Sequence, residues 1–164
     1  MDEEDKEIIA VAKDVLETLL SKMGVTGSVL PLDKAPVAEE EGGTSQVALE
    51  IKGDDLGILI GRRGQTLSSL PYLLRLIVGN QTENWAPIVI DVEGYRQRRY
   101  EGLRALAWRM AEQVRVTKMP FTLEPMSAYE RRIVHLALAD YPDLTTESIG
   151  EGEARRVVIQ PRKP

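Results

Sequence analysis

Apolar residues recur every three or four positions between Glu4 and Met23, behind an acidic first turn. This spacing, with Gly24 just past its end, predicts an amphipathic helix. Two runs with strand character follow, Gly27–Leu32 and Ser45–Lys52. They predict a β-hairpin with a long Pro- and Glu-containing connection.

The pattern then changes to two helical segments separated by glycines. Residues 53–70 predict a short helix, a turn bounded by Gly61 and Gly64, and the start of a longer helix that continues to about Val78. Pro71 is expected in the first turns of that helix, where its missing N–H costs least. The apolar run from Ala86 to Val92 predicts a buried strand. The first unit is therefore α-β-β-α-α-β, and we assign it residues 1–93.

A second unit, residues 94–164, has the predicted order α-β-α-β-β. Its first helix, residues 95–116, sets an apolar stripe against a polar face rich in arginine. A short strand at 121–123, a helix at 127–139 and two strands at 145–148 and 155–160, joined by a glycine turn, complete it. The predicted fold class is α+β, in two small domains.

Charge is distributed unevenly along the chain. The formal net charge of −5 argues against a nucleic-acid partner, because phosphate neutralisation dominates such binding. Residues 1–50, however, hold 12 acids and 4 bases, whereas residues 51–164 hold 14 acids and 17 bases. The second part is weakly basic and arginine-rich, which permits nucleic-acid binding without establishing it.

Composition also narrows the range of cellular compartments that we expect for the protein. With no cysteine, disulfides and thiolate chemistry are excluded, and a reducing compartment fits. The acidic N-terminus and the lack of a long apolar run predict neither a signal peptide nor membrane insertion. We expect a cytoplasmic protein.

The segment Gly61-Arg62-Arg63-Gly64 is the first candidate site. Glycines at both ends would let another backbone approach closely, and the free N–H groups of the following helix face the same space. A phosphodiester would fit there. Alternatively the glycines only close a helical hairpin or form an enzyme's phosphate loop, but the third glycine of a dinucleotide loop and the Gly-Lys-Ser/Thr of a P-loop are missing.

The second candidate site is the pair Arg131 and His135. Four residues apart on a predicted helix, the two side chains share a face and present donors suited to phosphate oxygens. His135 is the sole histidine of the chain. A single helical histidine is, by itself, more often structural than a ligand.

Two longer strings carry a family resemblance. Residues 59–67, Leu-Ile-Gly-Arg-Arg-Gly-Gln-Thr-Leu, resemble the signature of KH domains, and the element order resembles their type II form. Residues 126–135 and 148–159 resemble the R-three-H domain, which is named for its Arg-x-x-x-His motif. The two domains in this order resemble the bacterial Jag family, also called KhpB. Members often begin with a further small domain and a charged linker, for which we expect no room here.

The resemblance implies single-stranded RNA binding, with single-stranded DNA as an alternative ligand. By position, Gly61, Arg62, Arg63 and Gly64 would hold sugar-phosphate, and Arg131 with His135 a second stretch of strand. Ile58, Ile60, Leu67 and Leu70 would divide between groove floor and core. The resemblance further implies a post-transcriptional regulator or RNA chaperone linked to cell shape, elongation and division, with a small KH protein or self-association as the partnership.

The residue inventory also bears on two other classes of function. An enzyme would need a nucleophile, a base or a metal, and one histidine without cysteine is a poor inventory. Asp54 and Asp55 could coordinate Mg²⁺, but their position predicts N-capping of a helix. We therefore predict no enzyme, no cofactor and no metal. The alternative is a protein-interaction scaffold with little intrinsic RNA affinity.

Overall fold

The computed structural model describes residues 3–33 and 47–162. Contacts within the chain divide it into two compact units, Met1–Gln97 and Arg98–Pro164. The boundary predicted from sequence, after residue 93, lies four residues earlier. Each unit is described below by itself.

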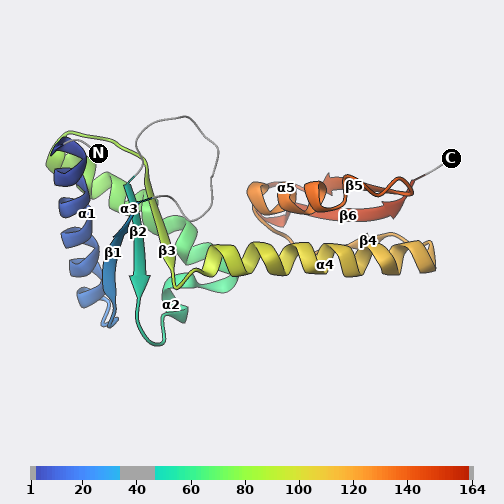
Figure 1. Cartoon of the computed structure of the whole chain (residues 1–164), viewed down its shortest axis with the longest axis horizontal. Coiled ribbons are helices and arrows are strands. Elements are labelled where there is room, and N and C mark those ends of the chain that lie inside the picture. The colour runs from blue at the N-terminus through green and yellow to red at the C-terminus, as the bar shows by residue number, and fades with distance from the viewer. Residues whose placement is uncertain (1–2, 34–46, 163–164) are drawn as a thin grey trace. The chain divides into compact units, whose positions relative to one another are not determined.

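The first unit is a three-stranded sheet with helices on one face (Figure 1). Strand β2 is central: it pairs antiparallel with β1 and parallel with β3. The order α-β-β-α-α-β and the mixed sheet agree with the predicted type II KH fold. The elements are α1 (Glu3–Lys22), β1 (Ser28–Leu32), β2 (Val47–Lys52), α2 (Gly57–Ile60), α3 (Gln65–Thr82) and β3 (Ile88–Val92).

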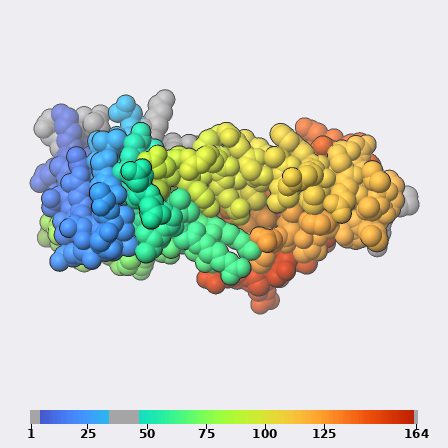
Figure 2. Space-filling view, turned by 90° about the horizontal axis from the view of Figure 1, so that it is seen from below, coloured from blue at the N-terminus to red at the C-terminus, as the bar shows by residue number. Residues whose placement is uncertain are grey.

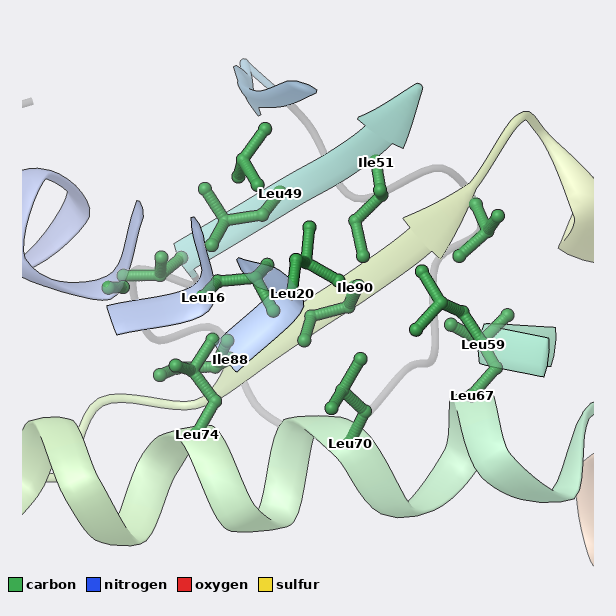
Figure 3. Close-up of a cluster of buried hydrophobic side chains, with 14 of the residues drawn as sticks. Leu16, Leu20, Leu49, Ile51, Leu59, Leu67, Leu70, Leu74, Ile88 and Ile90 are labelled. Atoms are coloured by element: carbon green, nitrogen blue, oxygen red, sulfur yellow. The ribbon is translucent and has the colours of Figure 1, made fainter. Parts of the chain in front are cut away.

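The core of this unit lies between the sheet and the helices α1 and α3 (Figure 3). Alternate residues of β2 and β3 point into it, because side chains of a strand face opposite sides in turn. Helical residues at three- and four-residue spacing meet them, which is the pattern that predicted these helices. The fully buried members include Leu16, Leu49, Ile51, Leu74 and Ile90.

Two details of α3 differ from the sequence prediction. The helix continues to Thr82, four residues past Val78, and ends where Glu83 adopts a left-handed conformation (φ 56°). Pro71 lies in the first two turns as expected, but as the seventh residue it is past the first four N–H groups, which are the ones without a partner in the helix. It therefore removes a bond to the Leu67 carbonyl, and the packing of the apolar face holds the helix together across it.

The second unit is a helix pair with a three-stranded antiparallel sheet of order β4-β6-β5. Strand β6 is central and pairs with β5 along its whole length, Leu144 opposite Pro161 through Ile149 opposite Arg156. The predicted order α-β-α-β-β is confirmed. The elements are α4 (Tyr95–Thr117), whose first residues belong to the first unit, β4 (Phe121–Thr122), α5 (Ala128–Ala137), β5 (Leu144–Ile149) and β6 (Arg156–Pro161).

The core of this unit is apolar and small. Leu103, Ala107 and Val114 of α4 are buried along one stripe, and Val157 and Ile159 of β6 are fully buried. The stripe at three- and four-residue spacing is the one that the sequence pattern indicated. Among the described residues, no helix is both long and apolar enough to cross a membrane.

Candidate nucleic-acid interface

The turn between α2 and α3 is built by left-handed backbone. Gly61 ends α2 with φ 69° and ψ −174°, a conformation essentially reserved for glycine. A single 3₁₀ turn, Arg62–Gly64, follows, in which Arg63 has φ 54° and Gly64 has φ 79°. Positive φ at Arg63 is a strained choice for a residue with a Cβ atom. The turn therefore stores conformational strain at the place where the sequence predicts a ligand.

The protein's own packing excludes a Cβ atom at Gly61 and crowds one at Gly64. A Cβ atom on Gly61 would overlap the Thr66 hydroxyl, and one on Gly64 would lie 3.0 Å from the ring of Tyr95. The sequence pattern favoured the approach of a ligand backbone as the reason for these glycines. The structure supplies a reason within the first unit, which stands whether or not a ligand binds.

The surface of the turn is partly basic and partly apolar. Arg62 is exposed and Arg63 half-buried, in a segment that lies at the surface of its unit (Figure 2). Ile58 is 64% exposed, whereas Leu67 and Leu70 belong to the core and Ile60 packs against it. Of the four apolar candidates, Ile58 is thus the one left facing outward.

The predicted capping role of Asp54 and Asp55 is wrong. Helix α2 begins at Gly57, its N-cap is Leu56, and no side chain caps it. Asp55 instead adopts φ 54°, a left-handed conformation that aspartate tolerates better than most residues. Within residues 3–33 and 47–162, no group of three or more His, Cys, Asp or Glu side chains is placed to hold a metal ion.

The second candidate site lies on α5, and hydrogen bonds stabilise the N-terminus of this helix. Ser127 and Glu130 form a capping box at α5, with the Ser127 hydroxyl accepting from the Glu130 N–H and the carboxylate accepting from the Ser127 N–H. Glu130 is also paired with Arg99 of α4, whose Nε lies 2.7 Å from its Oε1. Because Glu130 is 7% exposed, this pair ties α4 and α5 together inside the unit.

Arg131 and His135 both make hydrogen bonds within the protein. The Arg131 Nη1 donates to the Met126 carbonyl at 2.8 Å. His135 uses both ring nitrogens: Nδ1 lies 2.7 Å from the Thr146 hydroxyl and Nε2 2.9 Å from the Ser148 hydroxyl. All of these side chains are half-buried, so each remains reachable from solvent.

The electrostatics favour a neutral imidazole. Burial lowers the pKa of His135 below its ordinary value of 6.5, and the positive charge of Arg131 lowers this pKa further. The influence of Arg131 agrees with the prediction that the two side chains share a face. A neutral ring has one N–H donor and one acceptor, which suits two hydroxyl partners.

Thr146 and Ser148 were not among the residues singled out from sequence. The available signal was period-two alternation, which places both hydroxyls on one face of the predicted strand. Nothing in the sequence says that this face meets the helix bearing His135.

The arginines of α4 have mixed roles. Arg96 donates from Nε to the Ile90 carbonyl, Arg99 pairs with Glu130, and Arg115 pairs with Asp143 at 2.7 Å. Arg104 and Arg109 are exposed. Part of the basic face predicted for this helix thus serves the fold.

Comparison with known proteins agrees with the predicted type of both domains. The sequence model of the KH domain of KhpA and KhpB matches residues 13–90, and that of the R-three-H domain matches residues 101–161. The chain belongs to the KhpB family. The matched segments contain every candidate residue, from Gly61 to Gly64 in the first and Arg131 with His135 in the second.

Several curated members of the family are similar along most of this chain, and each carries the name RNA-binding protein KhpB. The protein of Clostridium symbiosum is 46% identical over 114 residues, which cover 70% of this chain and 51% of that protein. The protein of Bacillus subtilis is 37% identical over 138 residues, covering 77% and 66%, and that of Lactiplantibacillus plantarum 30% over 150 residues, covering 92% and 44%. The chain thus spans about half to two thirds of the length of these relatives.

Neither matching domain family is an enzyme family, in agreement with the prediction from the residue inventory.

Proposed function

We propose that the chain binds single-stranded RNA through the turn of its KH domain and through the surface around Arg131 of its R-three-H domain. One observation carries the proposal: a Gly-Arg-Arg-Gly turn with exposed Arg62 precedes the N-terminus of α3 in a domain of KH type. KH domains hold about four nucleotides at such a loop. The printed name of the relatives, RNA-binding protein, supports the same ligand.

Two weak sites on one chain would act together. When one module has bound, the second meets the same strand at high effective concentration, so the overall affinity exceeds that of either module. The proposal includes single-stranded DNA as a weaker ligand and a cytoplasmic role in post-transcriptional regulation that affects cell elongation and division. A small KH protein or a second copy of the chain is the proposed partner.

The experiment is fluorescence anisotropy with a labelled, unstructured RNA of mixed sequence at about 50 and 200 mM salt. If about four phosphates are neutralised, wild-type affinity should fall roughly 50-fold between these concentrations. Arg62→Asp/Arg63→Asp should weaken binding at low salt, because both charges over the turn are reversed. Aspartate tolerates the left-handed backbone at residue 63, so the fold should survive.

A matched control separates the site from net charge. Lys6→Glu/Lys13→Glu reverses two charges on α1 and should bind as the wild type does. An equal loss in both variants would mean that binding follows overall charge and not the turn. Arg131→Ala/His135→Ala tests the second module in the same assay.

The rival function is a protein-interaction scaffold. A scaffold without intrinsic RNA affinity should show no wild-type binding even at the lower salt concentration. That result would reject the proposed function for this chain.

A further inference from the structure

The imidazole of His135 is fully occupied by the protein. Its Nδ1 and Nε2 are bonded to the hydroxyls of Thr146 and Ser148, at 2.7 and 2.9 Å. The ring has two polar atoms in all, so a nucleic acid could bond to it only after one of these contacts breaks. The residue for which the motif is named is therefore poorly placed to contact a ligand itself.

The hydroxyls, in contrast, have bonding capacity left. A neutral ring donates one hydrogen and accepts one. The hydroxyl that receives the ring N–H keeps its own hydrogen for an outside acceptor, and the other hydroxyl, having donated to the ring, keeps a lone pair. Both side chains are half-buried on the same face of β5, two residues apart.

We propose that the hydroxyls of Thr146 and Ser148 contact the RNA backbone and that His135 is a positioning residue that fixes their orientation. The O–H left over is a donor for a phosphate oxygen, and the lone pair is an acceptor for a ribose hydroxyl. The proposal rests on the proposed function, since it concerns how the second module holds RNA.

Arg131 completes the site. Its Nη1 donates to the Met126 carbonyl, which holds a guanidinium that is close enough to His135 to influence the ring electrostatically. The positive charge is delocalised over the guanidinium, and its other N–H groups are donors. The same charge and the partial burial keep the pKa of His135 low, so the ring stays neutral and the hydrogen-bond pattern described above holds near pH 7.

The first test removes the hydroxyls. Thr146→Val/Ser148→Ala should weaken RNA binding about tenfold, the usual consequence of losing a hydrogen bond to a charged group. Thr145→Val is the matched control, because it makes the same change at the adjacent half-buried position on the opposite face of β5. It should bind as the wild type does, and Thr146→Ser, which keeps the hydroxyl, should retain binding.

The second test asks whether His135 acts through the hydroxyls. His135→Ala alone should also cost about tenfold, because the hydroxyls lose their orientation. In the Thr146→Val/Ser148→Ala background the same change should cost less than about twofold, since its effect is already lost. Equal losses in both backgrounds would show that the imidazole contacts RNA directly and would overturn the proposal.

The outcomes separate this proposal from the proposed function. If the wild type does not bind RNA, the proposed function fails. If the wild type binds and Thr146→Val/Ser148→Ala binds equally well, the present proposal alone is overturned. Should the double variant not fold, as judged by circular dichroism, Ser148→Ala alone carries the test: a loss supports the proposal and unchanged binding overturns it.

Discussion

The two candidate sites are built in different ways, one from backbone conformation and the other from side-chain hydrogen bonds. The turn of the first unit is a backbone structure, in which Gly61, Arg63 and Gly64 all have positive φ and no side chain caps the helix on either side. The site of the second unit is a side-chain structure, in which His135 is held by hydroxyls from a separate strand. The turn depends on the absence of Cβ atoms that would obstruct its backbone. The second site depends on the hydrogen bonds that its side chains donate and accept.

This difference determines how each site should respond to change. A backbone site fails when a Cβ atom is added, because the conformation itself becomes unavailable. A side-chain site fails when a polar atom is removed, while its backbone persists. Substitutions of the turn glycines should therefore change stability first, whereas substitutions of the polar side chains at the second site should change binding first.

Gly61→Ala is expected to have the largest effect. The new Cβ would overlap the Thr66 hydroxyl at a φ of 69° and ψ of −174°, so the first unit should lose about 2–4 kcal/mol of unfolding free energy. Urea unfolding followed by tryptophan fluorescence measures this. In a Trp108→Phe background, Trp85 is the remaining tryptophan and reports the first unit.

Gly57→Ala is the control for that prediction. A Cβ at this helical position meets no atom within 4 Å, so stability should stay within about 1 kcal/mol of the wild type. Equal destabilisation by both variants would contradict the view that the conformation of Gly61 is essential.

Arg63→Asn should have a smaller effect of the opposite sign. Arginine at φ 54° is strained, and asparagine tolerates the left-handed region, so the first unit should gain about 0.5–1 kcal/mol while RNA affinity falls with the lost charge. Arg62→Asn removes the same charge without a positive φ to relieve. It should weaken RNA binding without stabilising the fold, and an equal gain in stability would show that charge repulsion, not strain, is relieved.

The same contrast explains how much the sequence could predict. The element order and the apolar stripes follow from spacing, because burial imposes the period of each element on its sequence. The Gly61 and Gly64 turn was predictable because glycine is the residue that such a backbone requires. The capping role given to Asp54 and Asp55 was wrong because α2 starts two residues after Asp55, a boundary that local pattern does not define.

What sequence could not supply were the partners of side chains across elements. Arg131 and His135 were recognised from their spacing, but the contact of His135 with Thr146 and Ser148 depends on how α5 meets β5. The Arg99 pair with Glu130 joins residues that are 31 positions apart, and the arginine had been grouped with a basic surface. Such contacts come from tertiary packing, and the spacing of residues in one sequence does not predict which elements pack together.

The smallest expected effect is the pH dependence of the second unit. The pKa of His135 is lowered in the folded state by burial and by Arg131, whereas in the unfolded chain it is near 6.5. As pH falls below 6.5, the unfolded chain takes up a proton that the folded chain resists, so stability present at pH 7.5 is lost on the way to pH 5.5. His135→Gln should abolish that loss.

Because His135 is the sole histidine, its ring-proton signal in an NMR titration reports the folded pKa directly, and Arg131→Ala should raise this pKa. A folded pKa at or above 6.5 would contradict the lowering by burial and by Arg131. A folded pKa above 7 would mean that the ring is mostly charged at neutral pH, and the division between one donor and one acceptor hydroxyl would not hold.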